Sequence, residues 1–281
     1  MISINPKGNF GKHQMTTDIL QPSKLEIGRV ISQTFGVIGR NFVAFFLLAL
    51  VLSGLPTAVI SYFQAGIIGD QAASGTFNPS FISASVLGLL AAVVTASILQ
   101  GALVYGTVQD LNGVRPKVGE CLATGLRAFL PLLIVSILFG LAIGFGMILL
   151  IVPGIMIACA WCVAVPALVA DRTTITGAFG RAAELTRGNR WRIFGLFLVI
   201  LAMLIGLGLV VGLVSAAVIV PMALAGASPE ALAASAMMIP INAISNALTS
   251  LLGSAGVAVL YVELRRAREG VGADWLSKVF E

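Results

Sequence analysis

Charged residues are scarce in this chain of 281 residues: Asp, Glu, Lys and Arg make up 10% of it, whereas 58% of the residues are apolar. A soluble domain carries about 25% charged residues. Because so few charges cannot cover a globule of this size in water, the composition indicates a protein whose solvent is the lipid bilayer. The net charge of +5 would suggest a nucleic-acid partner in a soluble protein, but here it marks one side of a membrane. We expect no nucleic-acid partner.

Residue types that bind metals or perform catalysis are also few. The chain has one His, His13 in a polar segment, and three Cys. Cys159 and Cys162 have the spacing of redox motifs and metal ligands, but no second Cys pair follows, which favours two small core residues. No ionisable residue lies deep inside an apolar run, although proton-coupled transporters and intramembrane hydrolases usually carry one. We therefore expect no catalytic residue, no metal site and no cofactor.

Long apolar runs are what the chain does have. A helix needs roughly 20 apolar residues to span a bilayer. We predict six spans, at about 42–67, 81–108, 129–149, 154–170, 193–222 and 237–262. Spans three and four form one apolar stretch that is too long for a single crossing. We expect its hinge at Pro153-Gly154, since Pro and Gly interrupt helices.

The spans define one membrane domain, residues 24–270, between two polar tails. The N-terminal tail, residues 1–23, lacks the apolar core of a signal peptide, so the first apolar run is expected to be a spanning anchor. The C-terminal tail comprises residues 271–281.

All 17 Lys and Arg residues fall on one side of this arrangement. Because cytoplasmic loops retain Lys and Arg during insertion, we expect both termini in the cytoplasm. The basic residues lie before span one, between spans two and three, before span five and after span six: Lys7, Lys12, Lys24, Arg29, Arg40, Arg115, Lys117, Arg127, Arg172, Arg181, Arg187, Arg190, Arg192, Arg265, Arg266, Arg268 and Lys278.

Three amphipathic segments, 24–40, 116–128 and 174–187, precede the odd-numbered spans. Apolar residues at helical spacing, with basic residues elsewhere, are typical of helices that lie in the plane of the membrane interface. Thr173 or Thr174 can cap the third segment, and Gly188-Asn189 can end it. The predicted fold is all-α, with six transmembrane helices arranged as three hairpins, each preceded by a cytoplasmic interfacial helix.

The best candidate contact surface is a basic cluster on the cytoplasmic side. Arg binds phosphate in a bidentate manner, and Trp prefers the level of the lipid head groups. The cluster either binds anionic membrane lipids or a phosphorylated ligand, or only anchors the protein and sets its topology. Its members are Arg181, Arg187, Arg190, Trp191 and Arg192.

A second candidate is the polar face of span six, which includes Asn242, Asn246 and Thr249. It forms either a polar path or binding site, or hydrogen bonds between helices. Gln64 and Gln100 lie in spans one and two. They either join such a site or hydrogen-bond to each other or to a neighbouring backbone.

Two glycine pairs match the small-xxx-small pattern that lets membrane helices approach closely. We expect them to pack within the chain. The pairs are Gly140 with Gly144 and Gly208 with Gly212.

Three segments, Leu149–Ala170 with its Val-Pro-Gly hinge, Thr174–Trp191 and Tyr261–Gly270, together resemble the YciC-like and glycerophosphoryl diester phosphodiesterase membrane-domain-like proteins of bacteria. In relatives with the enzyme name, a separate soluble catalytic domain is joined to the membrane region. No segment here has the character of that domain, so the phosphodiesterase activity is not expected. The resemblance implies a multi-span protein of the bacterial inner membrane.

Two main functions remain open at this level, and a membrane enzyme ranks behind both. The first is a non-enzymatic integral membrane protein that serves membrane organisation, lipid interaction or a partner as a subunit. The alternative is a transporter or facilitator of a neutral or lipidic solute. The alternative requires a cavity lined by Asn242 and Asn246, with Gln64 or Gln100 as further lining.

Overall fold

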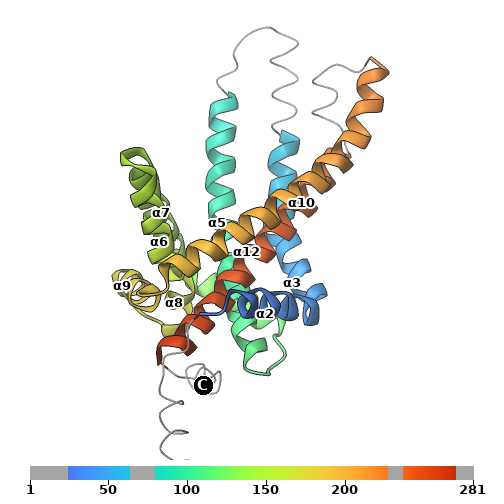
Figure 1. Cartoon of the computed structure of the whole chain (residues 1–281). Helices are drawn as coiled ribbons and strands as arrows, with labels where there is room; N and C mark the ends of the chain where they lie inside the picture. Colours follow the sequence, from blue (N-terminus) through green and yellow to red (C-terminus); the bar gives the residue numbers. More distant parts are fainter. Residues whose placement is uncertain (1–24, 64–79, 227–236, 270–281) are drawn as a thin grey trace, which may run out of the picture.

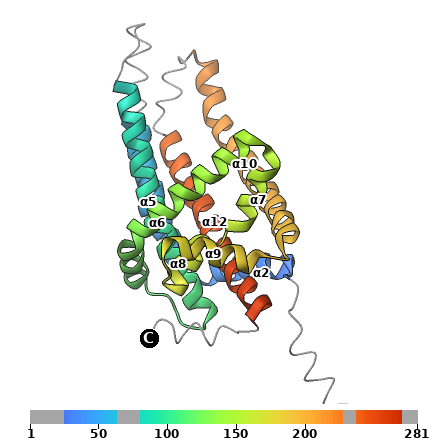
Figure 2. The same cartoon turned by 90° about the vertical axis from the view of Figure 1, so that its left-hand side faces the viewer.

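The structure is a computed structural model of the chain, and it describes residues 25–63, 80–226 and 237–269. In those ranges every regular element is a helix, as predicted. Long helices rise from one end of the molecule (Figure 1), and two short helices, α2 (Ile27–Arg40) and α9 (Ile175–Thr186), lie crosswise to them at one level (Figure 2). Both predicted tails, 1–23 and 271–281, fall outside the described residues.

Six helical stretches among the described residues are long and apolar enough to cross a membrane: Phe42–Phe63, Ile82–Leu111, Val118–Leu149, Ile151–Asp171, Arg190–Leu224 and Met238–Glu269. They match the six predicted apolar runs and indicate an integral multi-pass membrane protein. Their helices are α3 (Phe42–Ala49), which continues into a π-helical turn η1 (Leu50–Gly54), α5 (Ser80–Leu111), α6 (Val118–Leu149), α7 (Ile151–Trp161), α8 (Ala164–Asp171), α10 (Arg190–Leu224) and α12 (Met238–Glu269).

Two of the three predicted interfacial segments are separate helices. Asn41 separates α2 from α3, and Gly188, with φ +88°, follows the end of α9. Segment 116–128 instead forms the first turns of the 32-residue helix α6. The prediction of a separate interfacial helix at 116–128 was therefore wrong. Ala128 at its junction is a strong helix former, whereas Asn and Gly readily end helices.

The fold-back between α6 and α7 lies slightly before the predicted hinge at Pro153-Gly154. Leu150 is extended, with φ −166° and ψ 141°, and α7 begins at the next residue. Pro153 therefore sits in the first turn of α7, where its missing N–H costs no helical hydrogen bond. A Cβ added to Gly146 would lie 2.8 Å from the Cα of Gly154, so these glycines let the two arms of the hairpin meet.

Close helix packing occurs at a different glycine from those predicted. An added Cβ would meet nothing within 4 Å at Gly140, Gly144, Gly208 or Gly212. The prediction that these pairs pack within the chain was therefore wrong. At Gly125 of α6, in contrast, a Cβ would lie 2.4 Å from the carbonyl oxygen of Ile98 in α5. Only a glycine at that position lets α5 and α6 approach so closely.

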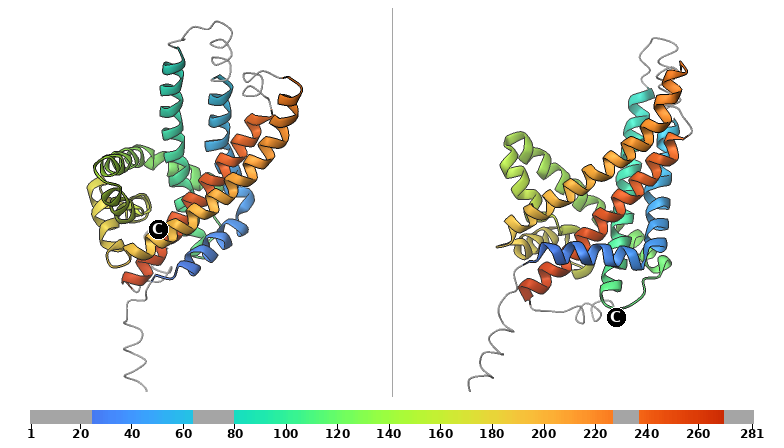
Figure 3. Two further views of the ribbon diagram at one scale, coloured as in Figure 1. Left: turned by 45° about the horizontal axis from the view of Figure 1, so that its top comes forward. Right: turned by 45° about the vertical axis from the view of Figure 1, so that its right-hand side comes forward.

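The core surrounds the C-terminal half of α12. Leu260, Tyr261 and Leu264 are fully buried, and α2, α5, α8 and α9 pack around this part of the helix. α10 runs beside α12 (Figures 1 and 3), and its N-terminal part also contacts α7 of the α6–α7 hairpin. Charged side chains of α8, α9 and α12 meet beside this buried part of α12.

Candidate functional site

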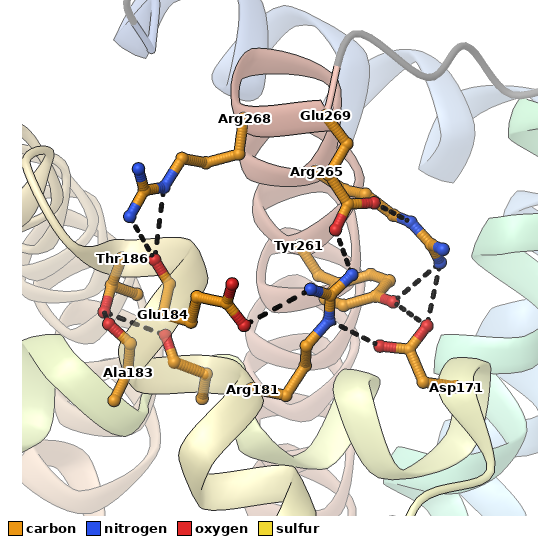
Figure 4. A network of polar contacts seen from close by, with 10 residues as sticks. Asp171, Arg181, Ala183, Glu184, Thr186, Tyr261, Arg265, Arg268 and Glu269 are labelled. Atoms are coloured by element: carbon orange, nitrogen blue, oxygen red, sulfur yellow. Dashed lines mark hydrogen bonds and ion pairs between the residues drawn. The ribbon is translucent and has the colours of Figure 1, made fainter.

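An ionic network joins α8, α9 and α12 (Figure 4). Its acceptor at the centre is Asp171, the last residue of α8. The Asp171 carboxylate accepts hydrogen bonds from Tyr261 Oη at 2.8 Å, Arg265 Nη1 at 2.8 Å and Arg181 Nε at 3.2 Å. Glu269 accepts from Arg265 Nε at 2.9 Å and also pairs with Arg181. We call these five residues the ionic network.

Burial gives this network its structural importance. The Arg265 side chain is only 5% exposed and that of Asp171 11%. A buried charge is tolerated when it is paired and hydrogen-bonded, and is strongly destabilising when its partner is lost. Burial opposes the charge of Arg181, but the hydrogen bond and charge of Glu269, with Asp171, raise its pKa. Arg181 is therefore held in its charged form, and the network holds three helices together.

The predicted spans gave no indication of this network, because Asp171 and Arg265 are 94 positions apart. The sequence does contain one signal for it. Tyr261, Arg265 and Glu269 follow one another at intervals of four residues, which places them on one face of a helix. Such a polar face at the end of an apolar helix indicates that a polar side chain of another helix packs against it.

A second pair of contacts ties α2 to α12 and to α5. The buried Glu263 of α12 accepts from Arg266 at 2.6 Å and lies 3.6 Å from Arg29 of α2. At the other end of α2, Arg40 pairs with Asp110 of α5 at 2.5 Å. These basic residues therefore stabilise the fold as well as contributing to the charge asymmetry.

The structure divides the predicted basic cluster into two groups. Arg181 belongs to the ionic network, and Arg192 donates to the backbone oxygen of Leu25 at 2.8 Å. Arg187, Arg190 and Trp191 are exposed, with 86% of Trp191 accessible. Only this second group presents its charge and aromatic ring outward.

Arg187 and Arg190 line a surface hollow with residues from α9 and α12. We call it the basic hollow; it is formed by Ala183, Glu184, Arg187, Arg190 and Arg268. Arg268 is held in place by two hydrogen bonds to the backbone oxygen of Glu184, from Nε at 3.2 Å and from Nη2 at 2.8 Å (Figure 4). Arg268 therefore also satisfies a carbonyl in the last turn of α9.

An apolar groove shares one lining residue, Arg190, with the basic hollow. It has a volume of about 280 Å³ and lies between α7 and α10, lined by Val152, Ile155, Met156, Cys159, Arg190, Trp191 and Phe194. Arg190 lines both the hollow and the groove. A single ligand with an anionic end and an apolar end therefore has matching surfaces next to each other.

The predicted polar face of α12 lies elsewhere, next to the first span. Asn242, Asn246 and Thr249 are exposed and line a shallow cavity of about 360 Å³ together with Thr57, Ser61 and Ser245. Ser53 Oγ donates to Asn246 Oδ1 at 2.8 Å, so part of this face does bond between helices. Gln100 is half-buried and does not line the cavity, and Gln64 lies outside the described residues.

No three His, Cys, Asp or Glu side chains of the described ranges gather closely enough to hold a metal ion. Comparison with protein-family models, curated proteins and solved structures found no match. The resemblance to the YciC-like proteins therefore stays a prediction. Any statement of function depends on the surfaces described above.

Proposed function

We propose that this chain is a non-enzymatic protein of the bacterial inner membrane that binds anionic lipids on its basic side. One observation carries the proposal: Arg187 and Arg190 are exposed beside Trp191, and neither has an ion-pair partner among the described residues. Paired arginines elsewhere stabilise the fold, so these two are available to an external anion. Arg and Trp together are suited to the head-group level of a membrane.

The arrangement of the acidic residues supports a non-enzymatic role. Asp171 and Glu269, the acids of the ionic network, accept hydrogen bonds from arginines and a tyrosine. A general acid or base must exchange protons with a substrate within hydrogen-bond reach. Carboxylates that are already saturated by charged donors are better suited to holding helices together.

Lipid content after purification tests the proposal. The full chain is extracted in mild detergent and its retained lipids are identified by native mass spectrometry. We expect anionic phospholipids to be enriched over their share in the membrane, and the melting temperature to rise with added phosphatidylglycerol, because a ligand that binds only the folded state stabilises it. Retention of lipids in the bulk proportion, with no such rise, would contradict the proposal.

The proposal also requires both termini in the cytoplasm. A periplasm-active reporter enzyme fused after Gly226, beyond α10, should be active, because that connection is expected outside. The same reporter fused after Gly113, between α5 and α6, should be inactive. The opposite pattern of activities would place the basic face on the wrong side of the membrane.

A second candidate function is a facilitator of a neutral solute, favoured by the polar cavity at Asn242 and Asn246. Exposed amides within an apolar span are costly in lipid and are often kept for a pathway. Proteoliposomes would be tested for uptake of uncharged polyols, with Asn242→Leu/Asn246→Leu as the matched variant. Uptake that depends on both amides is expected for a facilitator, and uptake no faster than in empty liposomes would exclude this function for those solutes.

A further inference from the structure

We infer that the basic hollow and the apolar groove form one binding site for a single glycerophospholipid. The phosphate lies among Arg187, Arg190 and Arg268, and one acyl chain lies along the groove between α7 and α10. This inference rests on the proposed lipid-binding function and names the place and the ligand class. It differs from general attraction of anionic lipids to the basic side, because it requires one defined set of residues.

The turn between α9 and α10 places the first two arginines. Gly188 adopts φ +88°, a conformation that other residues adopt only with strain, and Asn189 donates its backbone N–H to Thr186 O at 3.0 Å. The side chains of Arg187 and Arg190, on either side of this turn, enter the same hollow. The turn thus places Arg187 and Arg190, three positions apart in the chain, on the same hollow.

Arg268 contributes from α12 and is already oriented. It uses Nε and Nη2 to bond the Glu184 carbonyl oxygen. A guanidinium group has five N–H donors, so donors remain for an anion. Because the bonds to Glu184 hold its side chain in place, less conformational freedom is lost on binding than for a solvated arginine.

The N-terminus of α10 adds to the attraction. Its cap residue, Asn189, makes no side-chain hydrogen bond to the helix, so this cap leaves the backbone N–H groups of Arg190 and Trp191 without a side-chain acceptor. A helix start of this kind favours an anion. Arg190 is the first residue of the 35-residue helix α10, so the positive end of this helix adds to the charge of the three arginines that line the hollow.

Glu184 is the acid in the basic hollow, and it limits the charge of the ligand. Its carboxylate is 68% exposed and lies 3.5 Å from Arg181, which offsets part of its repulsion. Three arginines against one partly neutralised acid fit an anion of modest charge. A phosphodiester, which carries one negative charge, satisfies that condition.

The groove selects a lipid rather than a soluble phosphate. Its lining from Val152 to Cys159 covers about 10 Å of helix at a rise of 1.5 Å per residue, and the side chains there are apolar apart from Arg190 at one end. The groove therefore continues from the phosphate end toward the middle of the apolar spans. An acyl chain is the membrane component with that shape and polarity.

The test measures phosphatidylglycerol binding to the full chain in detergent by native mass spectrometry and melting temperature. Arg187→Gln/Arg190→Gln removes two arginines of the hollow, and Arg115→Gln/Arg127→Gln removes the same charge elsewhere on the basic side. We expect the first variant to lose about tenfold or more in affinity, since hydrogen bonds to charged groups contribute at least that much. The second variant should bind as the unmodified chain does.

Two further arms separate the sources of the signal. Met156→Trp fills the groove and should weaken binding of long-chain phosphatidylglycerol while leaving the melting temperature of the lipid-free protein unchanged. Inorganic phosphate at the same concentrations should not compete. Competition by phosphate, or unchanged lipid binding in Met156→Trp, would overturn the role of the groove.

The remaining outcomes distinguish this inference from the proposed function. Equal weakening in both double variants would leave general lipid attraction intact and overturn the defined site. Absence of any preference for phosphatidylglycerol in the unmodified chain would overturn both. If Arg187→Gln/Arg190→Gln fails to fold, Arg187→Lys/Arg190→Lys keeps the charge and removes bidentate bonding; unchanged affinity in that variant would overturn the site.

Discussion

α10 and α12 are both long enough to cross a membrane, and they differ in how they meet the rest of the molecule. In the most apolar 18-residue stretch of α10, no residue is buried within the protein, whereas in the corresponding stretch of α12 61% of the residues are buried. Ile193 and Leu196 are the buried residues of α10. The more polar helix is thus the inner one, because lipid accepts apolar side chains as readily as a protein core does.

The comparison shows what holds this fold together. In water, burial of apolar surface drives helices to associate, but between helices in lipid that driving force is lost and packing and hydrogen bonds replace it. α12 supplies both, through Leu260 and Leu264 and through the ionic network. α10 supplies an apolar surface that the rest of the described chain leaves uncovered, with the basic hollow at its N-terminal end.

The largest expected effect comes from removing the central acid of the ionic network. Asp171→Ala leaves Arg265 buried without its shortest partner, and loss of one member of a buried pair costs about 3–5 kcal/mol of stability. The measurement is the free energy of unfolding in mixed detergent and denaturing micelles. As a control, Glu120→Ala breaks an exposed pair with Lys117, which should cost about 0–1 kcal/mol. Equal losses in both variants would show that the network is not structural.

A leucine pair tests the inner and outer helices directly. Leu264 in α12 is fully buried, and Leu209 in α10 is 65% exposed. Leu264→Ala should cost about 2–4 kcal/mol because it leaves a cavity, while Leu209→Ala should change stability by less than about 0.5 kcal/mol. The same unfolding measurement applies. A comparable loss at Leu209 would mean that α10 is covered by another surface in the membrane.

Two glycines of α6 give the smallest difference. Gly125→Ala forces α6 away from the Ile98 carbonyl of α5 and should cost about 1–3 kcal/mol. Gly140→Ala meets open space and should be neutral or stabilise by up to about 1 kcal/mol, since Ala favours a helix over Gly. The ratio of folded to unfolded protein in detergent checks both. Destabilisation at Gly140 would indicate a contact that the isolated chain does not show.

Local signals along the chain predicted some elements well. Thr174 caps α9 by accepting a hydrogen bond from the backbone N–H of Gly177 at 3.2 Å, and Gly188 follows the end of that helix, both as predicted. These features depend on residues a few positions apart, where side-chain chemistry decides the backbone conformation. Segment 116–128 had the same amphipathic pattern without a stop residue, so it merged with α6.

The candidate site was predictable only in part. Arg187, Arg190 and Trp191 are within the predicted basic cluster, but nothing in the order of residues separates them from Arg181 and Arg192. Arg268 joins the basic hollow from α12, across a separation of 84 positions from its acceptor Glu184. Contacts between residues so far apart in the chain depend on how the helices cross. Local sequence patterns do not predict how the helices cross.

The sequence by itself determined the number of apolar spans and the gathering of basic residues, because both follow from hydropathy and charge along one dimension. Tertiary structure alone decided which span is buried and which arginines are free. In a bilayer an apolar residue is equally compatible with lipid and with protein, so composition does not reveal burial. An arginine stabilises the fold when it pairs with a residue that is distant in the chain, as Arg265 does with Asp171.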